Sequence, residues 1–122
     1  MSFGANKPPA VHTAAGQARA HTIVTDNRSK EIVKELEQNK SFPPVAFDKP
    51  HVVVTVGHDT NLSANYQSVR TSVSISIPCD PGNIAPVVAQ GWDLVEKILE
   101  ERALWAKDVL NVYNEVRRKM EG

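Results

Sequence analysis

The sequence predicts an α+β protein: an antiparallel β-hairpin or small sheet packed on a long C-terminal helix, with a short N-terminal helix and an extended N-terminal arm. The first observation is an alternation in residues 68–77: valine, threonine and isoleucine occupy the odd positions, and serine and arginine occupy the even positions. An extended strand points successive side chains to opposite faces, so this stretch has one apolar and one polar face. The second observation is a proline-free stretch after Pro86, in which apolar residues recur every three or four positions. That spacing is typical of one face of a helix.

Length and charge set limits on both fold and function. A chain of 122 residues is large enough for one domain with a hydrophobic core. Its 14 basic and 14 acidic residues cancel, which argues against strong binding to duplex DNA. The lone Cys79 has no disulfide partner and indicates a reducing compartment. Without an apolar run of about 20 residues or a signal-peptide core, we expect a cytoplasmic protein.

The N-terminal third is expected to hold an arm and a short helix. Residues 1–21 are rich in alanine, glycine and proline and predict an extended basic arm, followed by one α+β domain over residues 22–122. A short edge strand is expected over residues 22–25. The next helix begins at an N-cap, Asp26 or Asn27, and runs to about Asn39. Three apolar residues spaced three and four apart would form its buried face: Ile32, Val33 and Leu36.

A hairpin over residues 51–78 forms the centre of the predicted fold. The proline-rich residues 41–50 favour an extended connector, with Phe42 and Phe47 as anchors. The valines that follow alternate with other residues and predict the first strand. Residues 58–66 are rich in Asp, Asn, Ser and Thr, which predicts a long polar loop before the second strand.

The C-terminal helix is predicted over residues 83–120. It would be about 57 Å long at 1.5 Å per residue, whereas the hairpin would be only about 30 Å long. The helix is therefore expected to overhang the sheet or to bend near residues 101–103. Its unmatched apolar stripe predicts an interface with a second copy of the chain, in a dimer or larger assembly, through Leu110, Tyr113, Val116 and Met120. The alternative is that the arm and the short helix fold back over this stripe.

No set of residues in the sequence indicates catalysis or a cofactor. The four histidines (His12, His21, His51 and His58) lack the spacing of a zinc site, and Cys79 ends a strand, where a small buried residue is common. Phosphate-binding glycine loops and hydrolase or metalloprotease motifs are missing. We therefore expect a protein that is not an enzyme and that needs no metal or other cofactor.

The polar face of the hairpin is the candidate binding surface. It combines serine hydroxyls with Arg70 and the neighbouring Tyr66, a set able to contact a phosphate backbone and to stack on a base. Lys49 and Arg19 would add positive charge. The alternative is an ordinary solvated sheet face. The basic residues 117–119 complement the dipole at the end of the helix, and phosphate contact is a second role open to them.

One stretch carries a resemblance to a known group of proteins. Residues 65–79, N-Y-Q-S-V-R-T-S-V-S-I-S-I-P-C, followed by a long helix with Trp92 near its start, resemble small, mostly uncharacterised accessory proteins of phages and mobile elements. The resemblance covers about residues 52–104. It implies an accessory protein that works with replication or host proteins, and it transfers no catalytic residue.

Together these observations predict a non-catalytic, oligomeric accessory protein. It would contact single-stranded nucleic acid, or a machine that processes nucleic acid, through the hairpin face and the arm. The alternative is a virion or assembly component, or a protein-binding inhibitor, without nucleic-acid contact.

Overall fold

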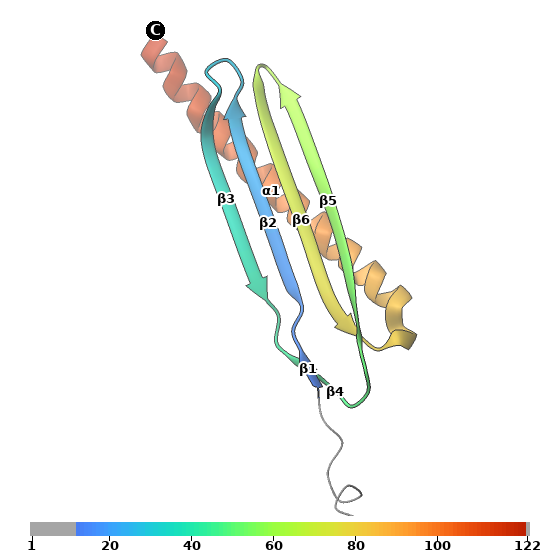
Figure 1. Ribbon diagram of the computed structural model, residues 1–122. Coiled ribbons are helices and arrows are strands. Elements are labelled where there is room, and N and C mark those ends of the chain that lie inside the picture. Colours follow the sequence, from blue (N-terminus) through green and yellow to red (C-terminus); the bar gives the residue numbers. More distant parts are fainter. Residues whose placement is uncertain (1–11, 122) are drawn as a thin grey trace, which may run out of the picture.

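The structure, a computed structural model, describes residues 12–121 and confirms the α+β class. Six strands are followed by one long helix (Figure 1). The elements are β1 (His12–Ala14), β2 (Gln17–Asp26), β3 (Glu31–Ser41), β4 (Val45–Phe47), β5 (Val52–Ala64), β6 (Gln67–Cys79), the short 3-10 helix η2 (Pro81–Asn83) and α1 (Ile84–Glu121).

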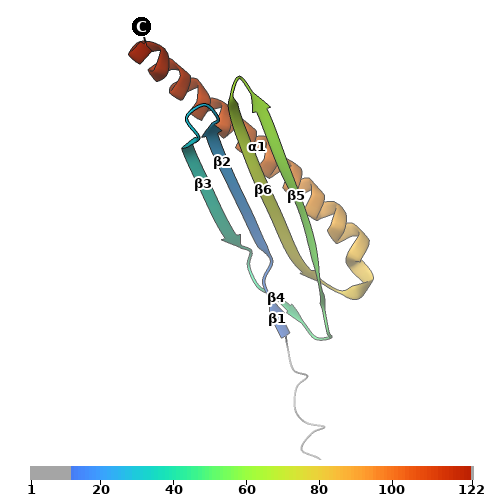
Figure 2. The same cartoon turned by 45° about the horizontal axis from the view of Figure 1, so that its top comes forward.

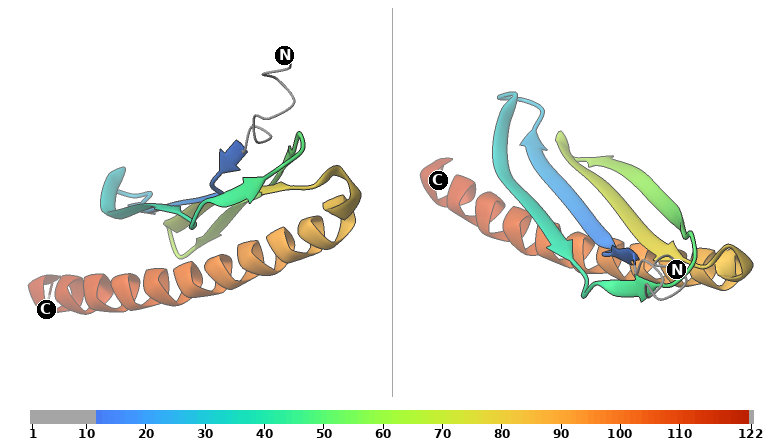
Figure 3. Two further views of the ribbon diagram at one scale, coloured as in Figure 1. Left: turned by 90° about the horizontal axis from the view of Figure 1, so that it is seen from below. Right: turned by 60° about the horizontal axis from the view of Figure 1, so that its bottom comes forward.

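The main sheet has four antiparallel strands in the order β3-β2-β6-β5, and β1 pairs with β4 in a small second sheet. The predicted hairpin is present as β5–β6. Figure 3 shows that α1 covers one face of the main sheet. In Figure 2 the helix crosses the sheet diagonally, from the start of β5 to beyond the turn between β2 and β3. One sheet face is therefore packed on the helix, and α1 leaves the other face uncovered.

The strand pattern of residues 68–77 is confirmed by burial. Thr71, Val73 and Ile75 lie on the helix side and are buried, whereas Ser72 and Arg70 are exposed. Val73 and Ile75 form the apolar interior together with Ala18, Ala20, Val56 and Val95. Removing these side chains from water is the main force that holds α1 on the sheet.

The predicted loop over residues 58–66 is wrong, because β5 and β6 continue to a two-residue turn. Asn65 and Tyr66 have positive φ angles of 52° and 63°, as a type I′ hairpin turn requires. Asparagine tolerates this conformation, whereas tyrosine adopts it rarely. The strands are consequently about 43 Å long rather than about 30 Å, at 3.3 Å per residue. In Figures 1 and 2 only the last turns of α1 extend past β2 and β3.

The predicted N-terminal helix is also wrong, because residues 31–41 form the edge strand β3. The pairing of β3 with β2 shifts between Val24 and Thr25, where Val33 is an extra residue on the β3 side. Such a bulge reverses the alternation of faces, so Val33 and Leu36 are both partly buried despite their spacing of three. A bulged strand has thereby produced a helix-like apolar spacing.

The predicted arm and the short strand of residues 22–25 need correction as well. Residues 12–14 form β1 and residues 17–21 are the start of β2, whereas residues 1–11 lie outside the described part of the chain. The strand predicted at 22–25 is part of the longer β2, which lies inside the sheet rather than at its edge. The connector is as predicted: Phe47 is buried and stacks on His51, with ring centroids 4.8 Å apart.

Helix α1 continues through residues 101–103, where its apolar stripe weakens because Arg102 faces the sheet. Arg102 is buried, and its guanidinium donates to the carbonyl oxygens of Leu36, at 2.8 Å, and Ala20, at 3.2 Å. It also donates to Oγ1 of Thr22 and Oε1 of Gln38. Burial lowers the pKa of this guanidinium below its ordinary value. One side chain of the helix thus binds both β2 and β3.

Candidate nucleic-acid interface

The uncovered sheet face carries charges of both signs. Arg19 and Arg70 lie on it, but so do Glu37 and Asp59, and the ring of His21 is hydrogen-bonded to the carboxylate of Glu35. Hydroxyl groups lie between them, and those of Thr55 and Ser76 are hydrogen-bonded to each other at 3.2 Å. A phosphate backbone is attracted by net positive charge, which this face lacks.

The four predicted contact residues do not lie together. Arg70 and Arg19 are on neighbouring strands, where Arg70 lies opposite Ile23 and Arg19 opposite Ser74. Tyr66 is in the β5–β6 turn, whereas Lys49 precedes the start of β5. The length of β5, about 43 Å, therefore separates Tyr66 from Lys49.

Tyr66 instead lies beside basic residues from two other segments. Its side chain is 69% exposed, and the guanidinium carbon of Arg28, in the β2–β3 turn, is 5.5 Å from its ring centroid. The backbone holds the two turns together, since the amide of Asn27 donates to the carbonyl oxygen of Tyr66 at 2.7 Å. Arg117 and Arg118 reach the same end of the molecule from α1. We call Arg28, Tyr66, Arg117 and Arg118 the turn-end site.

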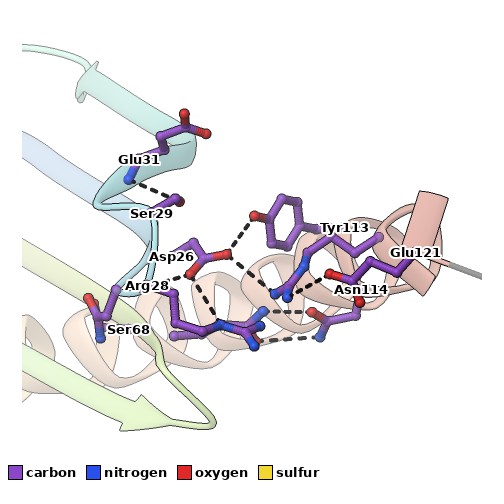
Figure 4. A network of polar contacts seen from close by, with 11 residues as sticks. Asp26, Arg28, Ser29, Glu31, Ser68, Tyr113, Asn114 and Glu121 are labelled. Carbon is purple, nitrogen blue, oxygen red and sulfur yellow. Dashed lines mark hydrogen bonds and ion pairs between the residues drawn. The ribbon is translucent and has the colours of Figure 1, made fainter. Parts of the chain in front are cut away.

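Asp26 organises this end of the molecule (Figure 4). It is 3% exposed, and its carboxylate accepts from the Tyr113 hydroxyl at 2.6 Å, the Arg28 amide at 2.9 Å and the Arg117 guanidinium at 3.4 Å. The Tyr113 hydrogen bond, then that of the Arg28 amide, lowers the pKa of Asp26 below its ordinary value. The same bond to Asp26 raises the pKa of Tyr113. One carboxylate therefore fixes the β2–β3 turn against the helix.

A second polar contact fixes the β5–β6 hairpin. The amide nitrogen of Gln67 donates to Asn114 Oδ1 at 2.6 Å, and the amide of Asn114 donates back to Gln67 Oε1 at 3.4 Å. Beside this pair is an open depression of about 330 Å³, lined by Arg28, Asn65, Gln67, Asn114, Arg117, Arg118 and Glu121. Its lining consists of guanidinium, amide and carboxylate groups.

The chemistry of the turn-end site suits a phosphate beside a flat ring. Guanidinium groups bind phosphate oxygens through paired hydrogen bonds. An exposed tyrosine stacks on a base of any sequence. Arg117 also pairs with Glu121 at 3.2 Å, whereas Arg118 is exposed and forms no ion pair within residues 12–121. Arg118 is consequently the most available cation of the three.

Sequence reasoning found Tyr66 but missed Arg28. Arg28 was expected inside a helix, and the signal that places it in a turn is the polar run Asp26–Lys30 between two stretches of strand. The basic residues 117–119 are evident in the sequence, but the position of Arg117 and Arg118 beside the two turns depends on the diagonal course of the helix.

The predicted interface residues of α1 point in different directions. Leu110 lines a groove beside β5, Val116 lines a groove beside β3, and Met120 is 82% exposed. The hydroxyl of Tyr113 is bound to Asp26. Tyr113 and Val116 line the same groove, but Leu110 lines another, and the part of the four residues in self-association stays a prediction.

Three further observations describe the rest of the molecule. Within residues 12–121, no cluster of three His, Cys, Asp or Glu side chains has the arrangement of a metal site. None of the helical residues described forms a segment that is long and apolar enough to cross a membrane. Cys79 is a buried free thiol at the end of β6.

No protein-family model, no curated protein and no solved structure matches this chain. The resemblance to accessory proteins of phages and mobile elements therefore stays a prediction from residues 65–79.

Proposed function

We propose that this chain is a non-catalytic, self-associating accessory protein that binds single-stranded nucleic acid at the turn-end site. The observation that carries the proposal is the exposed ring of Tyr66 beside Arg28, next to a depression that Arg117 and Arg118 also line. An aromatic face for a base and guanidinium groups for the adjacent phosphates form the minimal contact of a single-strand binder.

The strand would continue from the turn-end site along β6. Ser68 and Arg70 follow Tyr66 on the uncovered sheet face, and Arg70 is four residues, or about 13 Å, further on. Arg19 lies further along the same face on β2. Lys49 is at the opposite end of the sheet and falls outside this path.

The biological setting of the proposal rests on the sequence. The resemblance of residues 65–79 supports a phage or mobile-element origin and a partner in replication or in the host. The lone Cys79 supports a reducing compartment such as the cytoplasm.

The experiment is fluorescence anisotropy of a labelled oligothymidine with the full chain at several salt concentrations. We expect a slope of log affinity against log salt of about −2 from the three arginines of the turn-end site, at roughly 0.7 per phosphate on a single strand, and of about −3.5 where the strand also reaches Arg70 and Arg19. Tyr66→Ala should weaken binding about 5-fold to 100-fold through lost stacking. Arg118→Ala should weaken binding and also reduce the slope.

Lys49→Ala is the matched control, because it removes an exposed cation far from the turn-end site and should leave binding unchanged. Circular dichroism of each variant establishes that the fold is intact. Binding that is absent, or that falls equally with Lys49→Ala and Arg118→Ala, contradicts the proposal. A loss confined to Arg70→Ala and Arg19→Ala would place contact on the sheet face instead.

A second candidate function, protein binding, is favoured by a different observation. A groove of about 490 Å³ lies between β3 and α1, and apolar side chains from both elements line it, including Val33, Trp105, Val109 and Val112. An apolar groove beside a helix is suited to an apolar segment of another protein. Under nuclease treatment, capture of a host protein that Val112→Lys abolishes, together with no oligonucleotide binding, would favour this candidate.

A further inference from the structure

The two edge strands of the main sheet differ in how they are protected from pairing with another chain. An edge strand presents unpaired N–H and C=O groups, and folded proteins usually shield such an edge with charges, prolines or bulges. β3 has five charged residues and the bulge at Val33; the charged residues are Glu31, Lys34, Glu35, Glu37 and Lys40. This edge is protected.

β5 has almost none of these devices. Its thirteen residues contain one carboxylate, Asp59, and no lysine, arginine or proline. Its register with β6 runs without a shift from Val52 to Ala64. No described residue pairs with its other edge. β5 is therefore a long, regular edge with little charge to resist pairing.

An apolar groove lies beside the end of this same strand. It has a volume of about 510 Å³, and its apolar lining comes from β5, β6 and α1: Leu62, Ala64, Val69, Ala103, Ala106 and Leu110. The groove exists because α1 crosses the sheet diagonally (Figure 2). The helix packs closely on the middle of β5, where Gly91 meets Val56, but it leaves Leu62 65% exposed.

We propose that β5 is the interface between two copies of this chain, which pair antiparallel about a two-fold axis near His58 and form one continuous eight-stranded sheet. Centring the axis on the middle residue of β5 pairs all thirteen residues. It also sets Val54 of one copy opposite Leu62 of the other on the helix side of the sheet. Each Asp59 then lies opposite a Gly57, so the two carboxylates do not face each other.

The same symmetry supplies a cover for the groove. An antiparallel pair brings the start of one β5, with the N-terminal half of its α1, next to the end of the other β5. Trp92 is 18 residues before Leu110, which is five helical turns, so it lies on the flank of α1 that faces the β5 edge. Trp92 is 42% exposed. Pairing through β5 therefore covers the exposed Leu62 of one copy and Trp92 of the other in one contact.

This surface deepens the self-association in the proposed function and is independent of nucleic-acid contact. If the β5 dimer is not observed, the proposal for the turn-end site is unaffected, because the oligothymidine experiment tests that site separately. In the proposed dimer, the two turn-end sites lie at opposite ends of the eight-stranded sheet.

The test is sedimentation velocity of the full chain over a range of concentrations, compared with two matched variants. We expect about twice the 13.4 kDa chain mass for the unmodified protein. Leu62→Lys adds a charge to an exposed residue of β5 and should weaken dimerisation at least tenfold. Ile32→Lys makes the same change on β3, where the residue is 58% exposed, and should leave the dimer intact. Thermal unfolding of both variants establishes that each is folded.

Cross-linking supplies a second measurement that does not depend on destabilising the interface. His58→Cys places a thiol at the axis and should give a disulfide-linked dimer on mild oxidation, whereas Ile32→Cys should not. A monomer at all concentrations overturns the proposal. The proposal is also overturned if Val116→Lys or Ile32→Lys dissociates the dimer and Leu62→Lys leaves it intact, because that result places the second copy on the β3 side. A dimer that is lost only when residues 1–11 are removed overturns it as well.

Discussion

The two halves of α1 meet the sheet through different chemistry. In the N-terminal half, Gly91 and Val95 pack on apolar side chains such as Val56. From Arg102, at the middle of the helix, onward, Ala106 is also buried, but hydrogen bonds are added: from Arg102 to β2 and β3 and from Tyr113 to Asp26. Apolar packing is nondirectional, whereas a buried hydrogen bond requires a particular partner at a particular angle.

The difference assigns separate roles to the two halves. The apolar packing of the N-terminal half stabilises the contact between the helix and the sheet. The polar half fixes where the two turns stand relative to the helix, and therefore where Arg28 and Tyr66 lie relative to Arg117. The candidate binding site is built on the half whose geometry is fixed by polar contacts. Three changes test this division, and the largest expected effect comes first.

Arg102→Ala should destabilise the protein by about 3 kcal/mol, because it removes a buried charged donor and four hydrogen bonds to acceptors on β2 and β3. Urea denaturation measures the loss. Hydrogen exchange should accelerate in β3 more than in β5, since Arg102 bonds to Leu36 and Gln38. Arg70→Ala, at an exposed arginine, is the control and should change stability little. Equal acceleration in both edge strands would contradict a specific role for Arg102.

Gly91→Ala should destabilise by about 1 kcal/mol, although alanine in a helix is normally favoured over glycine by about that amount. The reason is contact, because a Cβ at Gly91 would lie 2.6 Å from Cγ2 of Val56. Gly82→Ala is the control, since a Cβ there meets nothing within 4 Å. Thermal unfolding gives the sign, and a more stable Gly91→Ala variant would show that the helix stands further from β5.

Tyr113→Phe should produce the smallest change, and one that depends on pH. Because the pKa of Asp26 is lowered in the folded state, its contribution to stability is present above its ordinary value of 3.8 and is lost as the pH falls through the lowered value. The pKa of Tyr113 is raised, so its contribution is present below its ordinary value of 10.0 and is lost as the pH rises through the raised value.

The measurement is the melting temperature of the wild type and Tyr113→Phe from pH 2 to 11. The difference between them should be largest near neutral pH and should shrink towards both extremes. A difference that stays constant with pH would mean that the hydroxyl of Tyr113 does not bond to the ionised Asp26.

The hairpin and the long helix could be predicted because their patterns are regular. The alternation from Ser68 to Ile77 has no bulge, and α1 contains no proline after Pro86. β3 could not be predicted in the same way. Its bulge at Val33 gives a spacing of three between two partly buried residues, and its many Glu and Lys residues are common in helices.

The candidate site was only partly predictable for a related reason. Tyr66 stood out as an aromatic residue in a polar stretch, but Arg28 and Arg118 reach it only through contacts between segments far apart in the sequence. The pairing of β2 with β6 and the hydrogen bond from Tyr113 to Asp26 bring these segments together. Local patterns contain no information about such pairings.

The bonds from Arg102 to Ala20 and Leu36 also bear on how the chain is made. In the sheet, β2 pairs with β6, which comes much later in the chain. The edge strand β3 is held by Arg102, which lies 66 positions after its partner Leu36. When only the first half of the chain has left the ribosome, β2 and β3 have been made but β6 and α1, which hold them, have not. Closing such long loops is slow, so acquisition of the native structure should wait until translation is nearly complete.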